Sequence, residues 1–148
     1  MSCEKEVIDK IHQWILKLTI SHKKLNNFSV CPYAHLAKYK IVCCELSKIN
    51  DFIPFSGVEV VIFVVEDKIA LNELINFCQE MNKNHEKYIF LDDHKDDPTY
   101  INEIQTNFGE FNLIIAQEKK KLLNAREKLH KTDYYKSWSK EMYDKIVK

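Results

Sequence analysis

One run of apolar residues, at positions 60–65, constrains the fold of this chain more than any other feature. It reads Val-Val-Ile-Phe-Val-Val, which is the longest apolar run in the sequence and is rich in β-branched side chains. Such a run is typical of a central strand covered on both faces, because both alternating sets of side chains are apolar. It is far shorter than the ~18 apolar residues of a membrane span. The sequence therefore predicts a buried strand over residues 57–65.

Other segments supply the remaining elements of a layered domain. Alternation and apolar content predict further strands at 39–46, 87–91 and 111–116. Apolar residues at helical spacing predict helices over about 3–20, 68–82, 117–130 and 133–147. A short helix is expected from Pro32 to about Lys38, since proline suits the first helical position. One more helix is expected between Asp97 as its cap and Gly109 past its end.

The order of these elements indicates the fold class. From residue 57 onward strands alternate with helices, which is the pattern of parallel β-α-β units with helices on both faces of a sheet. The strand at 39–46 is followed by a loop without a helix, so we expect it to be antiparallel or at an edge. A chain of 148 residues suits one domain. The sequence predicts a single α/β domain over residues 1–148, a three-layer sandwich with a four-stranded mixed sheet and helices on both faces.

Charge is unevenly spread along the chain, although it sums to zero. Residues 1–44 carry seven lysines and three acids, residues 45–110 five lysines and fourteen acids, and residues 111–148 ten basic residues and five acids. The chain has a single arginine, Arg126, whereas specific readers of nucleic acid use arginine for bidentate contacts. We therefore expect no specific nucleic-acid partner and no membrane partner, but a small molecule or another protein.

The cysteines and the N-terminal residues bear on the compartment. Five cysteines stand at positions 3, 31, 43, 44 and 78, an odd number without the spacing of a disulfide framework. The N-terminus reads Met-Ser-Cys-Glu-Lys-Glu, which is acidic and polar, unlike a signal peptide. Both features predict a cytoplasmic protein in which all five thiols are free.

The first candidate site is Ser-Val-Cys-Pro-Tyr-Ala-His at residues 29–35. If Pro32 begins a helix, Cys31 lies at its cap, where backbone N–H groups and the helix dipole favour a thiolate. His35 lies one helical turn along and would add positive charge, and Tyr33 would bind a ligand beside the thiol. The alternative is that Cys31 is a small buried residue that holds a turn.

Two other interpretations of this segment are disfavoured. Cys31-Pro32-Tyr33 is similar to the start of the glutaredoxin motif, but the fourth residue of that motif is cysteine and here it is Ala34. The apolar strand that precedes the glutaredoxin motif is also missing, so we reject that fold. A zinc site would need Cys43 or Cys44 beside Cys31, and adjacent residues of a strand point to opposite faces, so only one of them could join.

A second resemblance concerns the order of three features. Trp14, the motif Val-Cys-Pro-Tyr-Ala at 30–34 and the strand near Ile41 resemble an uncharacterised bacterial family, domain of unknown function 1415. Members of that family have an N-terminal helix with tryptophan, a Leu-Cys-Pro-Phe-Ala-like motif and then a strand. The resemblance covers roughly the first third of the chain and implies no known activity. The gap between tryptophan and cysteine is longer here, and the family's later histidine-containing and Arg-Ser-Pro-Tyr-Pro-like segments have no counterpart.

The second candidate site is Asp-Asp-His-Lys-Asp-Asp at residues 92–97, directly after a predicted core strand. In parallel sheets, sites gather outside the carboxyl ends of the strands. The carboxylates would bind a cation or a ligand, and His94 would perform acid–base chemistry. The predicted binding residues are Asp92, Asp93 and Asp96. The alternative is a solvated turn in which Asp97 caps the next helix.

Two functions remain open on this evidence. The chain has no Gly-rich phosphate loop, no Gly-x-Ser-x-Gly elbow and no His-Glu-x-x-His pair, so we expect no cofactor. One hypothesis is a small thiol-dependent enzyme or redox protein centred on Cys31, assisted by His35 or His94. The other is a non-catalytic module that binds a protein or a small ligand. The two differ in whether Cys31 opens into a pocket shared with residues 92–94.

Overall fold

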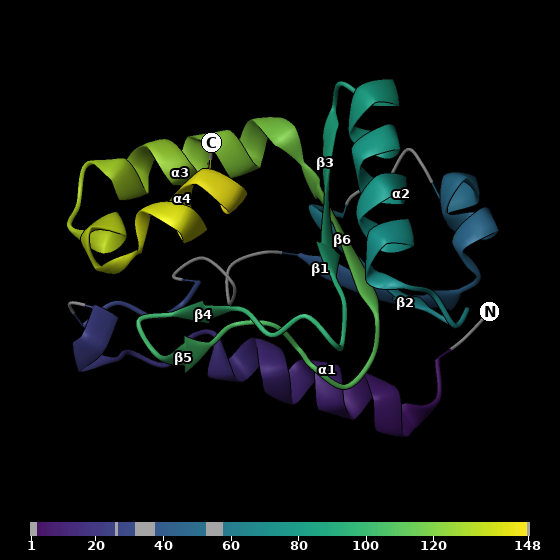
Figure 1. The fold of residues 1–148 in the computed structure, drawn as a ribbon, viewed down its shortest axis with the longest axis horizontal. Coiled ribbons are helices and arrows are strands. Elements are labelled where there is room, and N and C mark those ends of the chain that lie inside the picture. Colours follow the sequence, from purple (N-terminus) through teal and green to yellow (C-terminus); the bar gives the residue numbers. More distant parts are fainter. Residues whose placement is uncertain (1–2, 26, 32–37, 53–57, 148) are drawn as a thin grey trace.

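The computed structural model describes residues 3–25, 27–31, 38–52 and 58–147 (Figure 1). Its main sheet has four strands in the order β1-β2-β6-β3. The strands are Tyr39–Cys44 (β1), Val60–Val65 (β2), Tyr88–Asp93 (β3) and Leu113–Glu118 (β6). The α-helices are Lys5–Lys17 (α1), Leu71–Asn84 (α2), Lys119–His130 (α3) and Lys140–Ile146 (α4). Short 3₁₀ helices span Lys23–Leu25 (η1), Leu46–Phe52 (η2) and Tyr134–Ser137 (η3).

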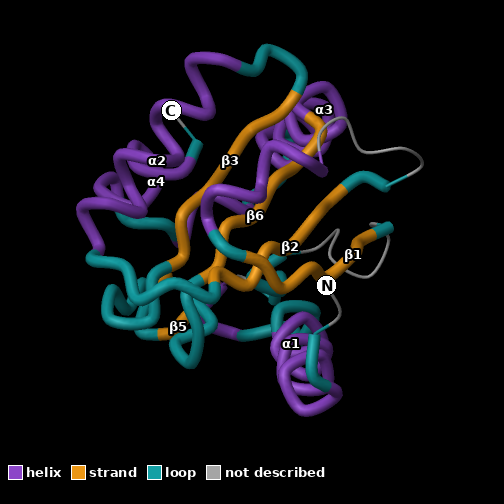
Figure 2. The backbone as a smooth tube through the Cα atoms, turned by 90° about the vertical axis from the view of Figure 1, so that its right-hand side faces the viewer, coloured by secondary structure: helices purple, strands orange, loops and turns teal. Residues whose placement is uncertain are grey.

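Helices cover both faces of this sheet, so the predicted fold class is confirmed. Alternation along β2 separates the two layers of core. On one face, Phe63 packs with α2 and η2, and on the other, Ile62 packs with α1. Figure 2 shows α1 nearly end-on beneath the strands. Phe63 is 0 % exposed, which agrees with the central, doubly covered strand that the apolar run predicts.

The strand directions differ from the expected parallel units. β6 pairs antiparallel with both β2 and β3, so the last strand of the sheet separates the two strands that α2 connects. β1 lies at an edge, as expected, but it runs parallel to β2. The connection over residues 45–59 is long enough for a parallel crossover, and its helix η2 packs on the α2 face through Ile49.

The helix expected between Asp97 and Gly109 is wrong, because the chain forms a β-hairpin there. Strands Tyr100–Ile101 (β4) and Ile104–Gln105 (β5) pair antiparallel. They are joined by Asn102 and Glu103, whose φ angles of 48° and 74° are both positive. A two-residue hairpin turn of type I′ requires that combination, and asparagine adopts it readily. Asp97 caps no helix, and its carboxylate lies 3.6 Å from the Nζ of Lys145.

The prediction of five free thiols is wrong for two of them. The structure joins Cys3 to Cys43 in a disulfide bond, with their Cα atoms 5.1 Å apart. Cys43 faces α1, whereas its neighbour Cys44 lies in the core on the α2 face, as expected of adjacent strand residues. The bond therefore ties the segment that leads into α1 to the edge strand β1, 40 positions along the chain.

Candidate functional site

The sheet face turned toward α1 is only partly covered by that helix. α1 packs on one end of the face through Ile11 and Ile15. Farther along, Ile115 of the inner strand β6 stays partly exposed, although Ile114 and Ala116 on the opposite face are both 0 % exposed. An accessible apolar residue in the middle of a sheet indicates open space above it.

A cavity of about 420 Å³ lies over this part of the sheet. The strands form its floor, α3, η3 and the end of α4 form its roof, and the end of α1 forms a wall. The floor residues are Tyr39, Val60, Ile62, Leu91, Ile115 and Gln117. The roof includes Leu122, Ala125, Arg126, Leu129, Tyr134, Tyr135, Trp138 and Ile146. Small-molecule sites typically have volumes of roughly 300–1,000 Å³ and mostly apolar walls, and this cavity has both properties.

The roof is positioned by the packing of α3 against α4. α3 begins directly after β6, so the chain turns back over the floor that β6 helps to form. A guanidinium N–H of Arg126 donates to the carbonyl of Ile146 over 2.9 Å. His130 adds two contacts of 2.7 Å, from Nδ1 to the carbonyl of Arg126 and between Nε2 and the hydroxyl of Tyr143. Figure 1 shows the two helices side by side, in green and yellow.

An aromatic cluster forms the part of the roof that follows α3. The ring centroids of Tyr134 and Tyr135 are 4.9 Å apart, and those of Tyr135 and Trp138 are 5.2 Å apart. The extended backbone at Trp138 ends η3 before α4 begins, so the single helix expected over 133–147 is divided in two. Burial raises the pKa of both tyrosine hydroxyls above the ordinary value, so both remain neutral at physiological pH.

Cys31, the predicted nucleophile, lies on the wall of this cavity. Its backbone N–H donates to the carbonyl of Leu18, just past α1, over 2.9 Å. The preceding carbonyl, of Val30, accepts a hydrogen bond from the hydroxyl of Tyr134. These two bonds hold the Val30–Cys31 backbone between α1 and η3. The helix expected from Pro32, with Tyr33 and His35, lies outside the described residues.

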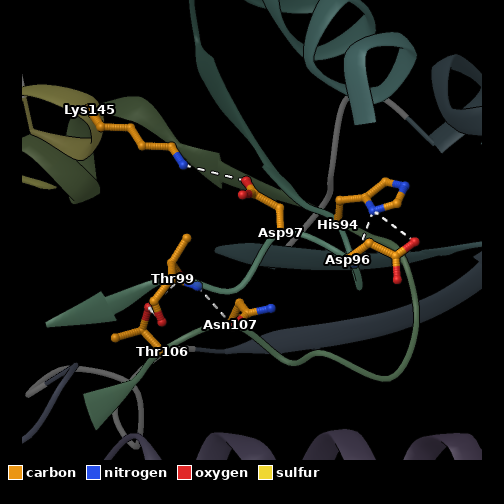
Figure 3. A network of polar contacts seen from close by, with 7 residues as sticks. All are labelled: His94, Asp96, Asp97, Thr99, Thr106, Asn107 and Lys145. Atoms are coloured by element: carbon orange, nitrogen blue, oxygen red, sulfur yellow. Dashed lines mark hydrogen bonds and ion pairs between the residues drawn. The ribbon is translucent and has the colours of Figure 1, made fainter. Parts of the chain in front are cut away.

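The second predicted site does not share the cavity, whose lining on β3 is Leu91. His94 is 4 % exposed, and its Nε2 lies 2.7 Å from the carbonyl of Ile69. Its Nδ1 accepts a hydrogen bond of 3.1 Å from the backbone N–H of Asp96 (Figure 3). Because a carbonyl only accepts and a backbone N–H only donates, these contacts define the neutral tautomer protonated on Nε2. Both ring nitrogens therefore hold the turn.

The aspartates of residues 92–97 do not converge on one point. Asp92 and Asp93 are consecutive in β3 and point to opposite faces of the sheet. The side chain of Asp96 is 74 % exposed, and Asp97 pairs with Lys145 of α4 (Figure 3). Within the described part of the chain, no group of three or more histidine, cysteine or acidic residues is arranged to hold a metal ion.

Comparison with known proteins gives no relative from which a function can be transferred. The chain matches no family model, no curated protein and no solved structure. The resemblance of its first third to domain of unknown function 1415 stays a prediction. The geometry of the cavity therefore indicates the function.

Several cavity residues were missed by the reasoning from sequence. From the sequence, Tyr135 and Trp138 belong to the apolar stripe of the helix predicted over 133–147. Arg126 bears only on the exclusion of a nucleic-acid partner. One signal was available: helical spacing places Arg126 on the same face of α3 as Leu122 and Leu129, where a solvated charge is not expected. Nothing in the sequence shows that α1 leaves part of the sheet uncovered.

Proposed function

We propose that this domain binds a small, largely apolar molecule in the cavity between the sheet and its C-terminal helices. The observation that carries the proposal is the accessible Ile115 on an inner strand, beneath a cavity of about 420 Å³. Burial of apolar surface contributes roughly 25 cal/mol per Å², so a ligand between the floor and the aromatic roof gains favourable free energy without any catalytic group. This is the binding-module hypothesis, with a small molecule as the partner.

An uncharged dye tests this proposal. N-phenyl-1-naphthylamine, which fluoresces in apolar surroundings, is expected to bind one site per chain with a dissociation constant on the order of 10 µM, or roughly 0.4 kcal/mol for each of its non-hydrogen atoms. Ala125→Trp places an indole in the roof from the middle of α3, and we expect it to weaken dye binding by about ten-fold or more. Fluorescence titration measures both constants.

The matched control is Asn124→Trp, at the exposed neighbouring position of α3. It adds the same side chain outside the cavity and is expected to leave dye affinity unchanged. Circular dichroism checks that both variants keep the fold. Absence of saturable dye binding, or an equal loss in the two variants, would contradict a ligand site in this cavity.

A second function, thiol chemistry, is favoured by one observation: Cys31 lies on the wall of the same cavity. We infer that the Cys31 thiol adds to an electrophilic carbon–carbon double bond of a ligand bound there: the C–S bond forms as the π bond breaks, and the proton lost by the thiol ends on the neighbouring carbon. Cys44 and Cys78 are buried, and burial raises their pKa to about 11 and about 12. His94 contributes no base to this chemistry, since both its ring nitrogens are engaged in the turn.

Alkylation tests the exposure of this thiol. In the native protein, iodoacetamide is expected to modify Cys31 about ten-fold faster than Cys44 or Cys78, because the latter two are buried and seldom ionised. Peptide mass mapping measures the three rates. Saturating N-phenyl-1-naphthylamine should slow the modification of Cys31, since the dye occupies the same cavity. Equally slow labelling of all three cysteines would exclude thiol chemistry and leave the binding function intact.

The compartment stays a prediction of the sequence, which favours the cytoplasm. No helix among the described residues has the length and apolarity to cross a bilayer. The bond between Cys3 and Cys43 persists only where thiols are not kept reduced. Alkylation immediately upon cell lysis, read at Cys3, distinguishes a cytoplasmic from an oxidising location.

A further inference from the structure

We propose that the ligand of this cavity carries a carboxylate and that Arg126 binds it at the roof. The inference rests on the proposed binding function and adds the chemical class of the ligand: a monoanion with an apolar, ring-containing body. It follows from the charge of the cavity lining and from the hydrogen bonds that already occupy three aromatic polar groups of the walls.

Arg126 carries a partly buried charge whose counter-ion is missing from the described residues. Its guanidinium donates to the carbonyl of Ile146, which carries no net charge. No carboxylate of the described residues lies within 4.0 Å of it. The hydroxyl of Tyr135 also interacts with it, and burial raises the pKa of that hydroxyl, so it brings no negative charge at physiological pH. Buried charges are normally paired, so the cavity has a place for an anion.

The other charges of the lining do not supply that anion. Glu59 and Lys121 pair with each other at 2.9 Å, and their hydrogen bond lowers the pKa of the carboxyl and raises that of the ammonium. The charged lining residues are Glu59, Glu118, Lys121, Arg126 and Lys128. Among the described residues of the lining, three cations and two carboxylates leave an excess of one positive charge, which a monoanionic ligand neutralises.

Three polar groups of the aromatic lining are already engaged, so these side chains present ring surfaces to a ligand. The hydroxyl of Tyr134 donates to a backbone carbonyl, and the indole N–H of Trp14 donates to the carbonyl of Thr106 over 3.2 Å. The hydroxyl of Tyr39 contacts the ring of His12. A carboxylate matches the planar fork of one guanidinium, whereas a phosphate offers three oxygens that call for more donors. The ligand class is therefore an apolar carboxylic acid with a ring-containing body.

Two probes that differ only in charge test the carboxylate. 2-Naphthoate and its neutral amide, 2-naphthamide, share the same ring system and compete with N-phenyl-1-naphthylamine for the cavity. We expect naphthoate to bind the wild-type protein about ten-fold more tightly than naphthamide, as a charge-assisted hydrogen bond implies. Arg126→Gln should bring the ratio of naphthoate affinity to naphthamide affinity to about one, and this ratio, taken within one variant, cancels any change in the shape of the roof that affects both ligands alike. Arg126→Lys keeps the charge but not the planar fork, so it should retain part of the preference for naphthoate over naphthamide.

The control variant is Lys120→Gln, which removes one positive charge from an exposed position of the same helix. It should leave the ten-fold preference intact, since a long-range effect of net charge is screened by salt. Equal affinities for the acid and the amide would overturn the carboxylate inference and leave the binding function standing. Failure of the dye to bind would overturn both. If circular dichroism shows that Arg126→Gln does not fold, the wild-type ratio and Arg126→Lys decide, and a ratio near one overturns the inference.

Discussion

Reduction of the bond between Cys3 and Cys43 is expected to lower the free energy of unfolding by about 4 kcal/mol. The two residues are 40 positions apart, and the closure of a loop of that length restricts the unfolded chain by roughly this amount in the chain-entropy model. The bond also fixes the start of α1 on the edge strand, beside the α1 face of the sheet. Urea unfolding with and without reductant measures the difference.

Cys3→Ser is the variant that isolates this bond. Cys3 is partly exposed, so serine at that position leaves no buried cavity, and the loss of stability reports the bond itself. We expect the variant to match the reduced wild-type protein and to show no further response to reductant. A wild-type protein whose unfolding ignores reductant, with five alkylatable thiols, would show that the bond does not form.

Acidification from pH 7.5 to pH 5 is expected to stabilise the fold through Asp93. Its Oδ1 is buried without a hydrogen-bond partner among the described residues, and its Oδ2 accepts only a long bond of 3.4 Å from the backbone N–H of Phe108. Burial, with a smaller contribution from the charges of Asp92 and Asp97, raises the pKa of this carboxyl from 3.8 to about 7. The folded protein therefore keeps a proton that the unfolded chain releases.

The sign of the effect follows from this difference in proton binding. Between pH 3.8 and about 7 the folded state binds more protons, so stability is largest at low pH and falls as the pH rises through this window. The full shift corresponds to roughly 4 kcal/mol, since one pKa unit is worth about 1.4 kcal/mol. Most of this change in the free energy of unfolding occurs between pH 5 and pH 7.5.

Asp93→Asn removes the titration while keeping an acceptor for Phe108. Urea unfolding at pH 5 and pH 7.5 should show a much smaller pH response in this variant than in the wild-type protein, and higher stability at pH 7.5. Asp96→Asn is the control, because the side chain of Asp96 is 74 % exposed and its loss should not alter the response. Identical pH responses in the wild-type protein and Asp93→Asn would disprove the assignment.

The elements that sequence reasoning predicted correctly are those whose signal is local. The apolar run at 60–65 gives an inner strand because no other environment accommodates six consecutive apolar side chains so well. The stripe that contains Ile11 and Ile15 gives α1 for a similar reason. Strand order carries no such local signal, because the place of β6 between β2 and β3 depends on contacts between distant parts of the chain.

The hairpin at 100–105 shows how a local pattern misleads. Ile101, Ile104 and Phe108 have helical spacing, but two residues with positive φ turn the chain, and Asn102 is the only one of these that favours such a turn. The polar contacts of Thr99 then fix the hairpin, since its backbone N–H donates to the side chain of Asn107 over 3.1 Å (Figure 3). Helical spacing and turn preference favour different structures for this segment. Tertiary packing decides between them, and the sequence does not show that packing.

The candidate site was predictable only through Cys31. A cysteine before proline is a candidate nucleophile because of its chemistry, and the structure does place Cys31 on a cavity wall. The cluster of acids at 92–97 predicts a site by its composition, but backbone groups form hydrogen bonds with both ring nitrogens of His94. The cavity itself arises because α1 stops short of Ile115 and α3 returns over Ile115. No sequence motif indicates either of these relations.

The main sheet is completed late during protein synthesis, because β6 is its last strand to be made and lies between β2 and β3. β2 and β3 share no hydrogen bonds and meet only through β6, whose last residue is Glu118. Until β6 has been made, the inner edge of β2, with its six apolar residues, has no strand beside it. Ribosomes add roughly 5–20 residues per second, so this edge stays open for roughly 3–10 s after Val65 is added. An open apolar edge is a template for pairing with other chains, and in that interval the nascent chain is a substrate for chaperones.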